Sequence, residues 1–383
     1  MKPGKVVCFL LLMICCTLFA CSDETTDKNA SNHEIIKLEE KKKPESVHKE
    51  ITMTAIGDML IHDSVYEDAK VEKGYDFSPM LGHVKPYLKN STITMANQET
   101  MIGGVELGLS SYPTFNSPYA VGDALKDAGV DVVTLANNHT LDGGNEAIQS
   151  AIRHWENIDM MYTGAYKNEA DSNKLRVYHT DEGISVGFLA YTYGTNGIPV
   201  PDGKNYLVNL IDRGLMQTDI QKAKKQADIV VLSLHFGDQY TRLPNDEQKA
   251  LVQFAADQGV DVVIGHHPHV LQPVDWVKGV NGNKTLVAYS LGNFLSGQDE
   301  FYRRIGGIFK FSVQKTINGD KESIEITSPK FMPTFVNYDH FSDFEVIPMF
   351  QLTNEELPNA KQHYKEIKQH MSQWMPGLKF IEK

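Results

Sequence analysis

From residue 51 onward, the chain alternates between short apolar runs and longer amphipathic segments. The apolar runs are rich in Val, Ile and Thr, and several are apolar throughout, which is typical of strands buried on both faces. They lie at residues 51–58, 91–97, 131–137, 184–191, 228–236, 261–267 and 285–294. Helical spacing of apolar residues occurs at residues 117–129, 143–157, 212–227 and 244–259. This alternation predicts an α/β fold with parallel or mixed sheets.

The first 21 residues of the chain follow another pattern. Residues 1–21 begin with two lysines and continue with an apolar stretch of signal-peptide length that ends at Cys21. This order resembles a bacterial lipobox and predicts lipidation of Cys21. The alternative is an uncleaved signal anchor. Either interpretation places the rest of the chain outside the cytoplasmic membrane, at its outer face.

The remaining residues are expected to form a tether, one domain and an extension. Residues 22–50 are polar, charged and nearly free of large apolar side chains, which predicts a solvated tether. No shift in composition divides residues 51–330, so we expect one domain there. Residues 331–383 are expected to form a C-terminal extension that packs on this domain, and the tail from about Ile324 is expected to be a β-rich finish with a covering helix.

Composition restricts the chemistry that the chain can perform. Its 383 residues carry a formal net charge of −12, which argues against general nucleic-acid binding because phosphate neutralisation needs a basic face. All four cysteines lie at or before Cys21, so the rest of the chain has no thiolate for catalysis or for zinc. A metal must therefore bind through His, Asp, Glu or Asn.

Polar residues gather at the ends of the predicted strands. They are Asp58, Asn97, Glu99, Asn137, Asn138, His139, His235, His266, His267 and His269. Because the carboxyl ends of parallel strands share one edge of a sheet, these side chains are expected to converge. Their types suit a pair of divalent cations that activates a water molecule. A single strand-end Asp or Asn is more often a turn or a helix cap, so the prediction rests on their conjunction.

Three histidines stand close together in the segment GHHPH. In an extended chain, alternate side chains point to the same side. We therefore expect His267 and His269 to reach one metal pair together and His266 to point away and serve a structural role.

Seven motifs follow one another over roughly residues 51–300. They are AIGDMLIHD, MANQET, PTFNSP, LANNHTLDGG, LHFGDQY, IGHHPHVLQP and YSLGNFL. In this order they resemble the CapA family of bacterial poly-γ-glutamate capsule proteins, within the calcineurin-like metallophosphoesterase superfamily. The resemblance implies an α/β two-sheet sandwich flanked by helices, in four layers αββα, with metal ligands at the strand ends.

The resemblance also assigns roles to single residues. It implies metal ligands at Asp58, Glu99, Asn138, His235, His267 and His269, and a general acid or phosphate contact at His139. His62, Asn97 and Asn293 are additional candidates, and Arg242 is a candidate anion contact. Leu60 stands where the phosphoesterases have a histidine, and Glu99 replaces their bridging aspartate, as it does in the capsule family. The expected cofactor is a pair of divalent ions of Mn, Zn, Fe or Mg.

Two functions agree with these observations. The first is a membrane-anchored dinuclear-metal hydrolase of capsule or cell-envelope polymer biosynthesis, acting on an anionic polymer or a phosphoester beside a membrane capsule-synthase complex. The alternative is a non-catalytic, polymer-binding accessory subunit of such a synthase or export complex. Because the chain and a glutamate polymer are both anionic, recognition of that polymer is expected to be local.

Overall fold

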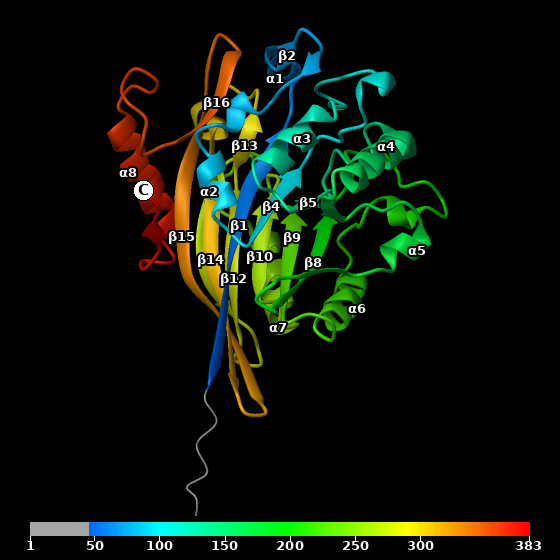
Figure 1. Cartoon of the computed structure of the whole chain (residues 1–383), viewed down its shortest axis with the longest axis vertical. Helices are drawn as coiled ribbons and strands as arrows, with labels where there is room; N and C mark the ends of the chain where they lie inside the picture. Colours follow the sequence, from blue (N-terminus) through cyan, green and yellow to red (C-terminus); the bar gives the residue numbers. More distant parts are fainter. Residues whose placement is uncertain (1–45) are drawn as a thin grey trace, which may run out of the picture. The chain divides into compact units, whose positions relative to one another are not determined.

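Two β-sheets form the centre of residues 46–383, which are the residues that this computed structural model describes (Figure 1). The predicted signal peptide, the lipidated Cys21 and the tether up to residue 45 lie outside the described residues. The larger sheet has the order β16 (Ser342–Pro348), β15 (Lys321–Asp339), β14 (Ile305–Asn318), β1 (Val47–Leu60), β4 (Ile93–Gln98), β5 (Val132–Thr134), β6 (Met161–Thr163), with β13 (Asn293–Ser296) on β1 and β17 (Lys379–Phe380) on β15. The smaller sheet has the order β11 (Leu271–Lys278), β12 (Lys284–Leu291), β10 (Val262–His266), β9 (Ile229–His235), β8 (Ser185–Thr192), β7 (Arg176–His179). A separate ribbon pairs β2 (Lys70–Val71) with β3 (Gly74–Tyr75).

Adjacent residues of the central strands face different layers, because side chains alternate along a strand. In the larger sheet, Val132 packs between the two sheets and Val133 packs beneath helices. In the smaller sheet, Val231 packs between the sheets and Val230 packs beneath helices on the far side. The layers therefore follow the order helix, sheet, sheet, helix, and the predicted α/β two-sheet sandwich is confirmed.

Helices cover the outer faces of both sheets. Over the larger sheet lie α1 (Asp63–Asp68), α2 (Lys85–Lys89), α3 (Ala120–Asp127) and α4 (Gly144–Asn157), and over the smaller sheet lie α6 (Arg213–Ala223) and α7 (Asp246–Asp257). The connections contain α5 (Glu169–Ser172) and the 3-10 turns η1 (Pro79–Leu81), η2 (Val105–Leu107), η3 (Asn205–Leu207) and η4 (Phe301–Arg304). Helix α7 begins with a capping box, in which the Asn245 side chain accepts from the Gln248 backbone and the Gln248 side chain accepts from the Asn245 backbone.

The strands extend past two of the predicted boundaries. β1 begins at Val47, where it pairs with Ile317 of β14, so residues 47–50 belong to the sheet rather than to the tether. β15 runs through residue 330, and β16 continues the same sheet. Helix α8 (Ala360–Ser372) then packs on β11 and β15 through apolar side chains that join the core between the sheets. The β-rich finish thus begins at β14, earlier than the sequence pattern indicated.

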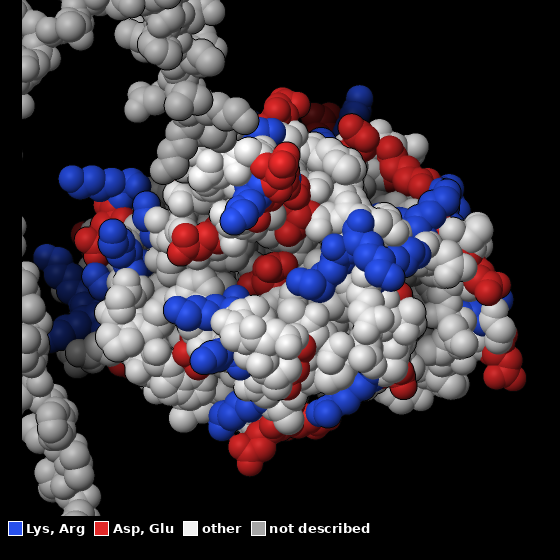
Figure 2. All heavy atoms as spheres, turned by 90° about the horizontal axis from the view of Figure 1, so that it is seen from below, with Lys and Arg blue, Asp and Glu red and all other residues white. Residues whose placement is uncertain are grey.

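Charges are mixed on the face of the molecule shown in Figure 2. Lysine and arginine side chains lie beside aspartate and glutamate side chains, with uncharged surface between them. Among residues 46–383, no helix has both the length and the apolar character that crossing a membrane requires.

Candidate metal centre

The predicted ligands meet where the parallel strands of both sheets end. The larger sheet contributes Asp58 near the end of β1, Glu99 directly after β4, and Asn138 in the loop after β5. The smaller sheet contributes His235 as the last residue of β9, while His267 and His269 follow β10. β1, β4 and β5 run parallel to one another, as do β9 and β10, so each set presents its carboxyl ends together.

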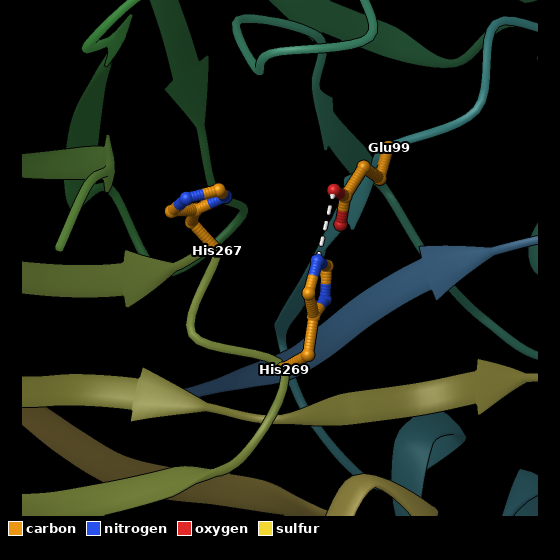
Figure 3. A group of neighbouring side chains, drawn as sticks. All are labelled: Glu99, His267 and His269. Atoms are coloured by element: carbon orange, nitrogen blue, oxygen red, sulfur yellow. Dashed lines mark ion pairs between the residues drawn. The ribbon is translucent and has the colours of Figure 1, made fainter. Parts of the chain in front are cut away.

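Five of these side chains form one buried group, which we call the Glu99 cluster: Asp58, Glu99, His235, His267 and His269. Ligand atoms of Glu99, His267 and His269 all lie within 4.8 Å of one another, and the same holds for Asp58, Glu99 and His235. Figure 3 shows the Glu99 carboxylate pointing at the His269 ring, with His267 facing the same space. Glu99 belongs to both sets, as a ligand shared by two cations would.

The surroundings of Glu99 fit a metal site. Its side chain is fully buried, and neither carboxylate oxygen has a hydrogen-bond partner within the described residues. The nearest imidazoles, Nε2 of His235 and Nε2 of His269, each lie 3.6 Å from its Oε1, beyond hydrogen-bond distance. Burial, with the charges of Asp58 and Asp142 adding to it, raises the pKa of Glu99 well above its ordinary value. A buried carboxylate without donors is costly, and a cation between these ligands removes that cost.

The pKa of Asp58 shifts in the opposite direction from that of Glu99. Burial alone would raise its pKa, but hydrogen bonds from His266 and His269 outweigh that effect and hold the pKa well below the ordinary value. Asn97 also donates from Nδ2 to Asp58 Oδ1 at 2.9 Å. Asp58 therefore stays a carboxylate in the interior and can act as an anionic ligand.

Two histidines of the cluster, His235 and His267, are neutral at physiological pH because their pKa values are lowered. Burial, together with the neighbouring His267, lowers the pKa of His235 far below its ordinary value. Burial and the neighbouring His269 lower the pKa of His267 to about 3. His235 Nε2 lies 2.6 Å from Asn138 Oδ1, so these two atoms converge on one point. Neutral imidazole nitrogens beside an amide oxygen and two carboxylates are a donor set suited to Zn, Mn or Fe.

The expected geometry of the three histidines was wrong in two respects. His267 and His269 both have positive φ, at 96° and 57°, so the segment after β10 is coiled, and its coil rather than an extended chain brings their rings to 5.8 Å. His266 does not point away, because its Nδ1 lies 2.9 Å from Asp58 Oδ1. The two-residue alternation ends with β10 at His266, which is why it fails for the residues that follow.

The contact between His266 and Asp58 predicts that replacing His266 affects metal binding. We expect His266→Ala to weaken metal binding by about 10- to 100-fold, because a partner that orients a ligand is lost. Elemental analysis after dialysis against graded chelator measures the effect. His370→Ala serves as a control, because His370 of α8 is a partly buried histidine outside the cluster whose Nε2 lies 2.9 Å from the Leu271 carbonyl oxygen of β11. Unchanged metal content in His266→Ala would contradict the orienting role.

The remaining predicted residues lie at different distances from the cluster. Asn293 Oδ1 lies 3.0 Å from His269 Nδ1 and fixes that ring. His62 is packed edge-on against Phe115, and burial lowers its pKa to about 4. Arg242 does not line the cavity beside the cluster; its Nη1 pairs with Glu366 at 2.8 Å and its guanidinium lies 3.9 Å from the Tyr302 ring, so its role as an anion contact stays a prediction.

His139 is held beside the cluster by a second carboxylate. Its Nδ1 lies 2.7 Å from Asp142 Oδ2, which also accepts the Phe115 backbone N–H at 2.7 Å. The ring packs edge-on against Phe115 at 4.7 Å between centroids. Asp142 therefore orients the His139 ring, and Nε2 remains the nitrogen available to a substrate.

The sequence reasoning missed the loop after β8. Tyr193 lies over the His267 ring at 4.6 Å, and Asn196 Oδ1 accepts from Asn138 Nδ2 at 3.2 Å. β8 is a central parallel strand that ends at Thr192, so the rule applied to the other strand ends would have found this loop. Together with His139 and His267, the loop lines a cavity of about 670 Å³ that opens beside the cluster.

Comparison with known proteins gives a family match over the residues that hold the Glu99 cluster. The family model described as bacterial capsule synthesis protein PGA_cap matches residues 52–298. The capsule biosynthesis protein CapA of Bacillus anthracis is 32% identical over 259 residues, which cover 66% of this chain and 61% of that protein. The PGA biosynthesis protein CapA of Bacillus subtilis (strain 168) is 26% identical over 317 residues, covering 78% and 77%. The match thus spans less than two thirds of the first relative.

Two solved structures show a distant likeness. A putative 5'-nucleotidase from Staphylococcus aureus in complex with alpha-ketoglutarate has a TM-score of 0.44 at 15% identity, with 82% of this chain and 58% of that chain covered. The calcineurin-like phosphoesterase YfkN from Bacillus subtilis has a TM-score of 0.40 at 17% identity, with 73% and 91% covered.

Proposed function

Because the chain belongs to the bacterial capsule synthesis family PGA_cap, we propose that it is a metal-dependent hydrolase of capsule or cell-envelope polymer assembly. Glu99 carries the proposal: it is a fully buried carboxylate with no hydrogen-bond donor on either oxygen among residues 46–383, and two sets of metal-competent side chains share it. Because nearly all buried polar groups in folded proteins have a partner, an unpaired buried carboxylate indicates a ligand site. Two divalent cations held by the Glu99 cluster and Asn138 would supply that compensation.

The chemistry divides between the metals and the protein's own groups. Bound divalent cations polarise a phosphoryl or acyl oxygen and lower the pKa of water. Asp58 and Glu99 would supply the anionic ligands, and the rings of His235, His267 and His269 would supply nitrogen ligands. His139, oriented by Asp142, is placed to give a proton from Nε2 to the leaving group.

The test compares metal-loaded and metal-free protein with two classes of substrate, a phosphoester and a γ-glutamyl amide. The purified protein is stripped with chelator, reloaded separately with Mn, Zn, Fe or Mg, and assayed with bis(p-nitrophenyl) phosphate and γ-glutamyl p-nitroanilide. We expect two metal ions per chain and turnover of one probe by at least one loaded form. Full metal occupancy without turnover of either probe would favour the accessory role instead.

One observation favours that accessory role. Leu60, which is buried at 2% exposure, fills the place of a histidine that would add a ligand next to Asp58. A site with fewer imidazoles could retain metals for binding a carboxylate polymer and not for hydrolysis. Poly-γ-glutamate binding that requires metal but yields no product would establish this second function.

We also propose that the protein is anchored at the outer face of the membrane through Cys21. The support is the lysine-containing start and the apolar stretch that ends at this cysteine. Changing Cys21→Ser is expected to shift the protein from the membrane fraction to the soluble fraction, since the lipid chain is lost. Fractionation and immunoblotting measure the shift, with Cys16→Ser as the matched control. Unchanged membrane association of Cys21→Ser would indicate a protein partner or an uncleaved anchor.

A further inference from the structure

The cavity beside the Glu99 cluster has an unusual set of side chains for a site expected to receive anions. It is lined by aromatic, amide, histidine and acidic residues, and among the described residues that line it there is no lysine or arginine. Arginine and lysine are the usual partners of carboxylate and phosphate groups. Away from the metals, this wall therefore offers little to an anionic chain.

Two exposed tyrosines stand at the wall of the cavity. Tyr112 is 78% exposed and Tyr193 is 50% exposed, and both line the cavity. Tyr193 connects the wall to the cluster, because its ring lies 4.6 Å from the His267 ring. Such rings present a flat apolar face and a polar hydroxyl edge, so they can stack on a ligand that is apolar on one face and polar at its rim.

The polar groups of the wall can both donate and accept hydrogen bonds. Asn196 and Gln239 contribute carboxamides, and Asp238 contributes a carboxylate that accepts from Asn245 Nδ2 at 2.8 Å. Asp238 and Gln239 both belong to the exposed turn after β9. Amides and a carboxylate around stacking rings suit hydroxyl groups and repel a second carboxylate.

The arginines close to the site are engaged elsewhere. Arg242 pairs with Glu366, and Arg303 pairs with Glu300 at 2.9 Å while its guanidinium lies 3.5 Å from the Tyr240 ring. Neither arginine lines the cavity. The wall consequently keeps its neutral to acidic character.

We propose that this cavity binds an uncharged, hydroxyl-rich group of the kind that a sugar ring presents. The substrate is then a saccharide carrying the ester or amide that faces the Glu99 cluster. This inference rests on the proposed function for the identity of the reacting group. The saccharide contacts themselves come from Tyr112, Tyr193 and the polar wall, so they do not require the metals.

The test measures binding rather than turnover. The full-length protein, metal-free and zinc-loaded, is titrated with N-acetylglucosamine trimer, cellotriose and γ-glutamate trimer, using calorimetry and saturation-transfer NMR. We expect at least one uncharged trisaccharide to bind both forms and the glutamate trimer not to displace it. Tyr112→Ala and Tyr193→Ala should each weaken saccharide binding by about tenfold. Phe341→Ala, which removes an aromatic side chain that is 44% exposed and lies outside the cavity, should not change it.

The outcomes separate this inference from the proposed function. Saccharide binding that the two tyrosine variants weaken supports the cavity assignment, even where the protein hydrolyses nothing. Metal-dependent hydrolysis without saccharide binding overturns the cavity assignment and leaves the proposed function standing. Displacement of the saccharide by the glutamate trimer, or binding of the glutamate trimer alone, also overturns it.

Discussion

Replacing Glu99 by glutamine is expected to remove bound metal from the protein while leaving it folded. The change keeps the shape of the side chain but removes the charge that two cations would share. A neutral amide cannot replace a shared anionic ligand, so we expect the metal affinity to fall by at least about 100-fold and hydrolysis to disappear with it. Metal per chain is measured by elemental analysis after equilibrium dialysis.

The stability of the metal-free protein gives this prediction a second readout. Burial, with Asp58 and Asp142, raises the pKa of Glu99 well above its ordinary value of 4.5. At pH values between the ordinary pKa and the raised pKa, the folded state keeps a proton on Glu99 that the unfolded state has released. The free energy of unfolding therefore falls as pH rises through this range. Glu99→Gln lacks this proton, so without metal its stability should fall less than that of the unaltered protein as pH rises from 5 to 8.

The control for Glu99 is a carboxylate outside the cluster. Glu106→Gln changes an exposed side chain in the turn η2 and should leave both metal content and pH dependence unchanged. Circular dichroism with thermal melting at each pH verifies folding. A folded Glu99→Gln protein that keeps two metal ions per chain would show that Glu99 is not the shared ligand.

The sequence predicts the layers well because residues that are buried in the fold are apolar in the sequence. Val132 and Val133 face different cores, as do Val230 and Val231, so strands buried on both faces read as continuous apolar runs. Edge strands have a weaker apolar pattern, because fewer of their side chains are buried. β7 is half-buried or exposed along its length and was missed, and the outer half of the β14 and β15 ribbon is partly exposed.

The site residues also differ in whether local sequence or long-range folding determines their positions. Asp58, Glu99 and His235 could be predicted because each stands at a strand end, and parallel topology brings strand ends together. The orientation of His266 could not be predicted, since it depends on where β10 stops and on the positive φ of His267 and His269. The partnership of Asp142 with His139 likewise appears only when the loop after β5 folds onto Phe115.

Replacing His139 by alanine is expected to reduce turnover sharply without removing the metal. The residue is placed as a proton donor rather than as a member of the Glu99 cluster, so metal content should stay unchanged. General acid catalysis contributes about 10²- to 10⁴-fold, and its value is greatest for leaving groups that are poor without a proton. We therefore expect a large loss of kcat with an alkyl phosphodiester and a smaller loss with bis(p-nitrophenyl) phosphate. Asp142→Asn should show the same dependence on the leaving group, with a smaller loss, because it disturbs only the orientation of the ring.

A second histidine and aspartate pair in the same protein provides the matched control for this result. His154 Nε2 lies 2.9 Å from Asp123 Oδ1 where α4 packs beside α3, and its ring stacks on Tyr119 outside the site. His154→Ala should therefore leave kcat unchanged for both leaving groups. If His139→Ala lowers kcat equally for both, His139 contacts the substrate without donating a proton. If it instead loses metal, the ring belongs to the metal site, and the proton must come from another group.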